Sequence, residues 1–200
     1  MTLRRLTRYL HSGDVLLIGF LCMLTAIDLI FASRIPRWKE LVVINVVVVT
    51  SIFCLAYFRH TTGNRILRYI HDWYIAPGVF LSFKELYFMI HPLHGRDYDD
   101  LLIAADRWLF GVDPTHWIGQ FAHPVLTEIL QLAYTSFYFL FLLVGYELYR
   151  RKDYGLFQLF MFTCVYGFFL SYLGYFTLPA IGPRFTLHDF SALDRELPGL

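Results

Sequence analysis

The sequence has little net charge and few cysteines, and both shortages exclude classes of function. Its 17 basic and 16 acidic residues leave a formal net charge of +1, which argues against nucleic acid as a partner. The three cysteines, Cys22, Cys54 and Cys164, lie inside apolar runs and form no Cys-x-x-Cys pair. We therefore expect thiols buried in a membrane, not a disulfide framework or a zinc site. The sequence also has no internal repeat and no low-complexity linker, which indicates one membrane domain over residues 1–200.

The chain has an excess of apolar residues. Of its residues 57% are hydrophobic, compared with roughly 45–50% in a soluble domain. The excess forms five blocks, covering residues 15–32, 41–58, 73–90, 125–149 and 154–178. At about 1.5 Å per residue, the shorter blocks just cross a hydrocarbon core of ~30 Å. They show no period-2 alternation, and backbone groups cannot stay unpaired in lipid. The sequence therefore predicts an all-α, multi-pass transmembrane bundle.

The connections between these blocks predict the orientation of the chain. Basic clusters precede the first block, separate the second from the third and separate the fourth from the fifth. If five spans alternate, all three clusters lie on one side, which the positive-inside rule assigns to the cytoplasm. We therefore predict a cell-membrane protein with a cytoplasmic N-terminus. Residues 91–124 and the segment after the last span then face outward.

The predicted outer loop, residues 91–124, contains an amphipathic segment of its own. From Tyr98 to Phe110, leucines and aspartates fall on different helical faces, which is typical of a short helix lying in the membrane interface. Two histidines in this loop, His91 and His94, and the neighbouring aspartates match no usual metal-ligand spacing. We predict neither a metal nor another cofactor.

Polar side chains also occur inside the predicted spans, where they are costly and usually face the bundle interior. Lys84, Glu85 and Glu128 lie toward the outer ends of their spans, and Gln131 continues a polar stripe from Glu128. One interpretation is interhelical hydrogen bonding, with Lys84 paired to Asp28 or Glu128. Their shared depth favours an alternative, a polar cavity that opens to the outer face. Its predicted lining residues are Lys84, Glu85, Glu128, Gln131 and Tyr134.

The last apolar block ends in "LPAIGPRF", where Gly182 and Pro183 precede Arg184. Proline and glycine stop the helix, and irregular backbone at headgroup depth is tolerated only if it packs in protein or lines a cavity. A guanidinium holds two phosphate oxygens at once and keeps its charge at any working pH. We predict that Arg184 binds the phosphate of a membrane lipid substrate, with Gly182 and Pro183 as its supporting segment. The alternative is an arginine that anchors the helix end at ordinary lipid phosphates.

Three stretches, "DYDDLLIAADRWLFGVDPTHW", "AYTSFYF" and "GYFTLPAIGPRF", resemble the type 2 phosphatidic acid phosphatase superfamily. Within it, the chain looks most like the inositol-phosphorylceramide synthase-like branch. The resemblance runs from about Glu85 to Phe185. It implies a core of six helices and metal-independent phosphoryl transfer to or from a phosphorylated lipid, through a phosphohistidine. We therefore expect a lipid phosphatase or phosphotransferase that acts at the outer membrane face.

The histidine motifs of that superfamily do not occur in these 200 residues. There is no Pro-Ser-Gly-His, and after Ser33-Arg34 the position where the superfamily has a histidine is Glu40. Both catalytic histidines normally lie downstream of the Gly-Pro-Arg segment. We therefore expect the sequence to be the N-terminal part of a longer protein, and we assign no catalytic residue within it. Two other functions stay open: a transporter or flippase of an anionic solute, and a non-catalytic membrane scaffold if the chain ends at Leu200.

Overall fold

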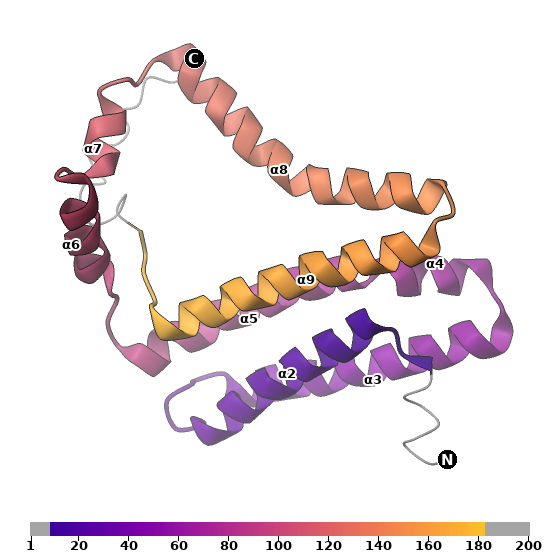
Figure 1. The fold of residues 1–200 in the computed structure, drawn as a ribbon. Helices are drawn as coiled ribbons and strands as arrows, with labels where there is room; N and C mark the ends of the chain where they lie inside the picture. Colours follow the sequence, from indigo (N-terminus) through magenta and orange to yellow (C-terminus); the bar gives the residue numbers. More distant parts are fainter. Residues whose placement is uncertain (1–8, 183–200) are drawn as a thin grey trace. The chain divides into compact units, whose positions relative to one another are not determined.

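The computed structural model describes residues 9–182, except for the side chain of Tyr138, and the described chain is helical without a β-strand (Figure 1). Its helices are α2 (Ser12–Ile30), α3 (Trp38–Thr62), α4 (Arg65–Trp73), α5 (Ile75–His94), α6 (Asp99–Phe110), α7 (Pro114–Gly119), α8 (Pro124–Arg150) and α9 (Tyr154–Thr177). The all-α fold class predicted from the sequence is confirmed. The chain divides into two compact units, which we call the first unit (Met1–Gly95 with Glu147–Phe176) and the second unit (Arg96–Tyr146 with Thr177–Leu200).

Three of the described helices, α2, α3 and α9, are long and apolar enough to cross a membrane. Helix α8 adds a fourth crossing if its two halves, Pro124–Phe137 and Phe139–Arg150, form one span despite a bend of 43° between them. Helix α5 occupies most of the predicted span 73–90 and carries two charged residues in its middle, Lys84 and Glu85. It does not meet the same criterion, so a crossing there stays a prediction.

The core of the first unit lies between α2, α3, α5 and α9, which run alongside one another (Figure 1). Helix α2 buries Leu17, Phe20, Leu21 and Leu24, which recur at the i, i+3, i+4, i+7 spacing of one helical face. The ring of Phe20 stacks on that of Phe169 from α9 at 4.0 Å between centroids. Helix α5 comes close to α2 at a glycine, because a Cβ added at Gly78 would lie 2.8 Å from Leu17 Cδ2.

A short helix that the sequence did not predict, α4, precedes α5 in the same unit. Helix α3 ends at Gly63, whose φ of +61° suits the left-handed position after a helix. The side chain of Asn64 then caps α4 by accepting a hydrogen bond of 2.8 Å from the backbone N–H of Ile66. The buried residues of α4 are polar, His71 and Asp72, so this helix brings ionisable groups into the first unit.

The second unit contains the predicted loop helix. Helix α6 begins one residue after the predicted start and ends at Gly111, whose φ is +71°. A guanidinium–carboxylate pair then joins α6 to α7, with Arg107 donating to both oxygens of Asp113 at 2.7 and 3.0 Å. Trp108 of α6 is 83% exposed, and the location of this helix in a membrane interface stays a prediction.

Candidate functional site

The candidate site is built around the segment that follows α9 in the second unit. The carboxylate of Asp99, in the first turn of α6, accepts hydrogen bonds from the backbone N–H of Ile181 at 3.0 Å and of Gly182 at 2.7 Å. The neighbouring Tyr98 N–H donates to the carbonyl of Pro179 at 2.8 Å. Asp99 itself is buried, with 5% of its surface exposed. The start of α6 therefore fixes the backbone of residues 179–182.

Gly182 is needed at this point for its backbone conformation. Its φ of +107° lies in a region that side-chain-bearing residues rarely adopt. The sequence analysis assigned Gly182 to the supporting segment before a phosphate-binding arginine, and the structure shows Gly182 in an irregular, hydrogen-bonded backbone. Pro183 and Arg184, the other two residues of that prediction, lie outside the described residues.

Two of the five predicted cavity residues, Glu128 and Gln131, line one cavity in the second unit. It has a volume of about 330 Å³ and runs along one face of α8, where Leu132, Thr135, Ser136 and Phe139 also line it. Tyr134 belongs to the same helix but is not among the residues that line this cavity, and 66% of its surface is exposed.

The other two predicted cavity residues, Lys84 and Glu85, lie in the first unit and face different environments. The Lys84 side chain is exposed, and its ammonium lies 5.5 Å from the centroid of the Phe80 ring. No ion pair of Lys84 with Asp28 or any other residue occurs within 9–182, so the predicted pairing to Asp28 was wrong. Glu85 is buried and accepts a hydrogen bond of 2.7 Å from Asn45 of α3. A cavity shared by all five residues stays a prediction.

A second polar cluster, which the sequence analysis missed, lies in the first unit where α2 begins and α4 ends. The clustered side chains are His11, Asp14, Arg59, His71 and Asp72, from three separate stretches of the chain. Among the described residues, His11, Asp14 and His71 are a group whose potential ligand atoms all lie within 4.8 Å of one another. The sequence offered only one signal for this cluster, the polar residues at the ends of the apolar blocks. Such residues do not show which ends of which blocks contact one another in the fold.

The two imidazoles of this cluster have opposite electrostatic surroundings. Burial and the adjacent Arg59 guanidinium together lower the pKa of His11. Burial also disfavours the charged form of His71, but the carboxylates of Asp14 and Asp72 outweigh it, and the pKa of His71 is raised. The cluster therefore contains one imidazole biased toward the neutral form beside another biased toward the charged form.

Comparison with known proteins agrees with the resemblance noted in the sequence. Neither a curated protein nor a solved structure matches the chain. Residues 100–197 match the family model described as the PAP2 superfamily. The matched region begins directly after Asp99 and includes α7, α8, α9, most of α6 and the Gly-Pro-Arg segment. This match in the C-terminal part of the chain supports its assignment to the PAP2 superfamily of phosphatases and phosphotransferases.

Proposed function

We propose that this chain is part of an integral membrane enzyme that hydrolyses or transfers the phosphoryl group of a phosphorylated lipid. The match of residues 100–197 to the PAP2 superfamily supports the phosphatase or phosphotransferase class. The apolar helices α2, α3 and α9 support a membrane location. On the sequence resemblance we place the chain in the inositol-phosphorylceramide synthase-like branch, with its site at the outer membrane face and a phosphohistidine as the reaction intermediate.

The observation that carries this proposal is the hydrogen bonding of Asp99 to the backbone directly before Pro183 and Arg184. The fixed Gly182 backbone lies two residues before Arg184, and Pro183 restricts its own φ to about −65°. Both restrictions limit where the Arg184 side chain can reach. A guanidinium that is positioned in advance loses little conformational freedom when it binds a phosphate.

Arginine suits the chemistry of phosphoryl transfer for two reasons. Its planar guanidinium donates two parallel hydrogen bonds to phosphate oxygens, and it stays charged at every pH at which the enzyme works. In the transition state, negative charge is spread over the non-bridging oxygens of the transferred group, and a fixed cation there lowers the barrier. We assign no nucleophile to residues 1–200, because the superfamily's histidine motifs do not occur in them.

The proposal is tested by replacing Arg184 in the full protein, reconstituted in lipid vesicles or nanodiscs. Arg184→Ala should lower kcat/KM for phosphate release from a lipid phosphomonoester by about 10²–10³, the usual effect of removing one transition-state donor. Arg184→Lys should recover only part of this loss, because a lysine keeps the charge but not the paired donors.

Arg34→Ala is the matched control. Arg34 is an exposed arginine between α2 and α3, on the same predicted face of the membrane, and its guanidinium lies over the Phe31 ring at 5.9 Å. Its replacement removes an equal charge and should leave turnover unchanged. Wild-type turnover in Arg184→Ala would refute phosphate binding by Arg184. The proposed function itself would be refuted if the wild-type protein neither hydrolysed lipid phosphomonoesters and diesters nor transferred their phosphoryl groups to an acceptor alcohol.

A further inference from the structure

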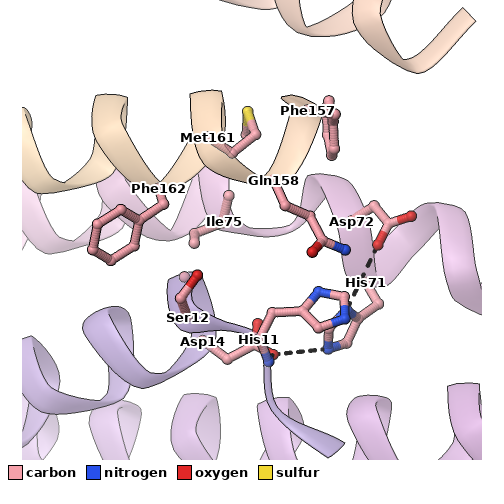
Figure 2. Close-up of a pocket in the computed structure, with 11 residues that line it drawn as sticks. His11, Ser12, Asp14, His71, Asp72, Ile75, Phe157, Gln158, Met161 and Phe162 are labelled. Atoms are coloured by element: carbon pink, nitrogen blue, oxygen red, sulfur yellow. Dashed lines mark hydrogen bonds and ion pairs between the residues drawn. The ribbon is translucent and has the colours of Figure 1, made fainter. Parts of the chain in front are cut away.

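The cluster of ionisable side chains in the first unit lies outside the region that matches the PAP2 superfamily. His11 directly precedes α2, Asp14 lies in the first turn of α2, and His71 lies near the end of α4. Figure 2 shows these three side chains converging below α9, which covers them with Gln158 and Met161. Two separate segments of the chain, the start of α2 and the end of α4, therefore direct nitrogen and oxygen atoms toward one place.

The groups in this cluster are buried without full hydrogen bonding. His71 and Asp14 are 2% and 3% exposed. His71 Nε2 forms an ion pair with Asp14 Oδ2 at 3.2 Å, and Asp72 Oδ1 lies 3.4 Å from Arg59 Nη2. Neither His71 Nε2 nor Asp72 Oδ1 makes a hydrogen bond of good geometry with another described residue. Buried ionisable atoms are usually held by such bonds, and a metal ion would give the nitrogen of His71 and the oxygen of Asp14 a closer partner.

We propose that His11, Asp14 and His71 bind a divalent first-row transition metal ion, with Zn²⁺ as the reference case. Two imidazoles and one carboxylate are a usual donor set for Zn²⁺ and for similar cations. With metal–ligand bonds of about 2.1 Å, two ligand atoms can lie at most about 4.2 Å apart. The three atoms, which lie within 4.8 Å of one another, need to move inward by about 1 Å.

The size and charge of the site favour a single cation over a larger ligand. The cavity between these side chains has a volume of about 30 Å³. That is room for one or two water-sized groups, and too little for a phosphate ester or a lipid headgroup. With neutral imidazoles, the carboxylates of Asp14 and Asp72 outnumber the single guanidinium of Arg59. In the deprotonated form that binds a metal, the site is therefore negative overall.

The proposed carboxylate ligand is already oriented by its neighbours. The Tyr74 hydroxyl donates to Asp14 Oδ1 at 2.5 Å, and the His11 backbone N–H donates to Asp14 Oδ2 at 2.7 Å. Contacts of this kind around a ligand fix its direction before a metal binds, and they are typical of metal sites in proteins. A bound cation would join the start of α2 to the end of α4.

Arg59 is the group that competes with the cation. Its Nη1 lies 2.7 Å from His11 Nε2 and 3.1 Å from His71 Nδ1, so one guanidinium contacts both imidazoles. Its Nη2 lies 3.4 Å from Asp72 Oδ1. When a cation binds, the guanidinium has to leave the imidazoles, and the Asp72 carboxylate offers it a second position. Removal of Arg59 should therefore strengthen metal binding.

The test uses the full protein without a histidine tag, purified in detergent and treated with a chelator. Zn²⁺ at about 100 times its dissociation constant should raise Tm by about 5–10 °C, and fresh chelator should reverse the rise. Co²⁺ should give a visible absorption band at one equivalent per chain. His11→Ala, a change at a partly exposed position, should abolish both signals. Arg59→Met should increase the Zn²⁺ affinity at least tenfold.

His60→Ala is the matched control, because His60 directly follows Arg59 and its ring lies against that of Tyr9, at 4.5 Å between centroids, without joining the cluster. It should retain both signals, which rules out binding by surface histidines. A wild-type protein with no Zn²⁺-dependent rise in Tm and no Co²⁺ band overturns the proposal. So does an Arg59→Met variant that loses stability without a gain in Zn²⁺ affinity, because the cluster is then only a hydrogen-bonded network. None of these readouts depends on lipid phosphatase activity.

Discussion

Asp99→Asn is the most direct perturbation of the candidate phosphate site, because it changes hydrogen bonding at nearly constant shape. The carboxylate accepts from Gly182 N at 2.7 Å through Oδ1 and from Ile181 N at 3.0 Å through Oδ2. An asparagine keeps one acceptor, and its NH₂ group then faces the other backbone N–H. A hydrogen bond to a charged group contributes about 1.5–3 kcal/mol. These bonds are partly exposed, so we expect a loss of about 2 kcal/mol.

This loss should appear as local opening of the segment after α9. A cost of about 2 kcal/mol corresponds to about 30-fold faster exchange of the amide hydrogens at 181 and 182. Hydrogen exchange with mass spectrometry on a peptide covering 178–182 measures it directly. Asp97→Asn is the control, because Asp97 makes no hydrogen bond to another residue in the described part of the chain. Unchanged exchange in Asp99→Asn would refute the idea that Asp99 fixes this backbone.

Two further predictions concern packing and pH. Gly78→Ala should lower the free energy of unfolding by about 1–3 kcal/mol, because its Cβ would lie 2.8 Å from Leu17 Cδ2. Gly19→Ala, where nothing lies within 4 Å, should not lower Tm in detergent, because alanine favours the helix, and an equal loss in both variants would contradict the close approach of α2 and α5. The Arg107 guanidinium lowers the pKa of Asp113, so their pairing is present above the usual carboxyl range and disappears as pH falls through the lowered pKa. An NMR titration should place the Asp113 midpoint lower in the wild type than in Arg107→Gln.

The sequence was sufficient for the helices because lipid leaves the backbone few alternatives. Apolar blocks without period-2 alternation have to be helical in a membrane, and α2, α3 and α9 begin and end within a few residues of their predicted bounds. Helix α6 was predictable for a different reason. Its leucines and aspartates occupy opposite faces, and Gly111 marks its end with a positive φ. All of these signals are local in the sequence.

The features that the sequence did not show depend on contacts between distant segments. Helix α4 was missed because its basic residues indicated only a connection between two spans. In the structure, Asn64 caps this helix and His71 is buried on it. The role of Asp99 was missed as well. It is one of several aspartates in the same loop, and only its burial beside residues 179–182 distinguishes it from them. Spacing along the chain cannot show which of these aspartates meets the end of α9.

The end of α9 can be understood by following its backbone donors. Helix α9 ends at Thr177, and an irregular segment follows it, whose backbone N–H groups need partners where they are buried. Pro179 and Pro183 have no N–H to satisfy, and Ile181 and Gly182 donate to Asp99. Residues 178–183 therefore carry only four backbone N–H groups, and the buried Asp99 carboxylate pairs two of them. This pairing explains how the backbone stays irregular at the two positions directly before Pro183 without unpaired donors there.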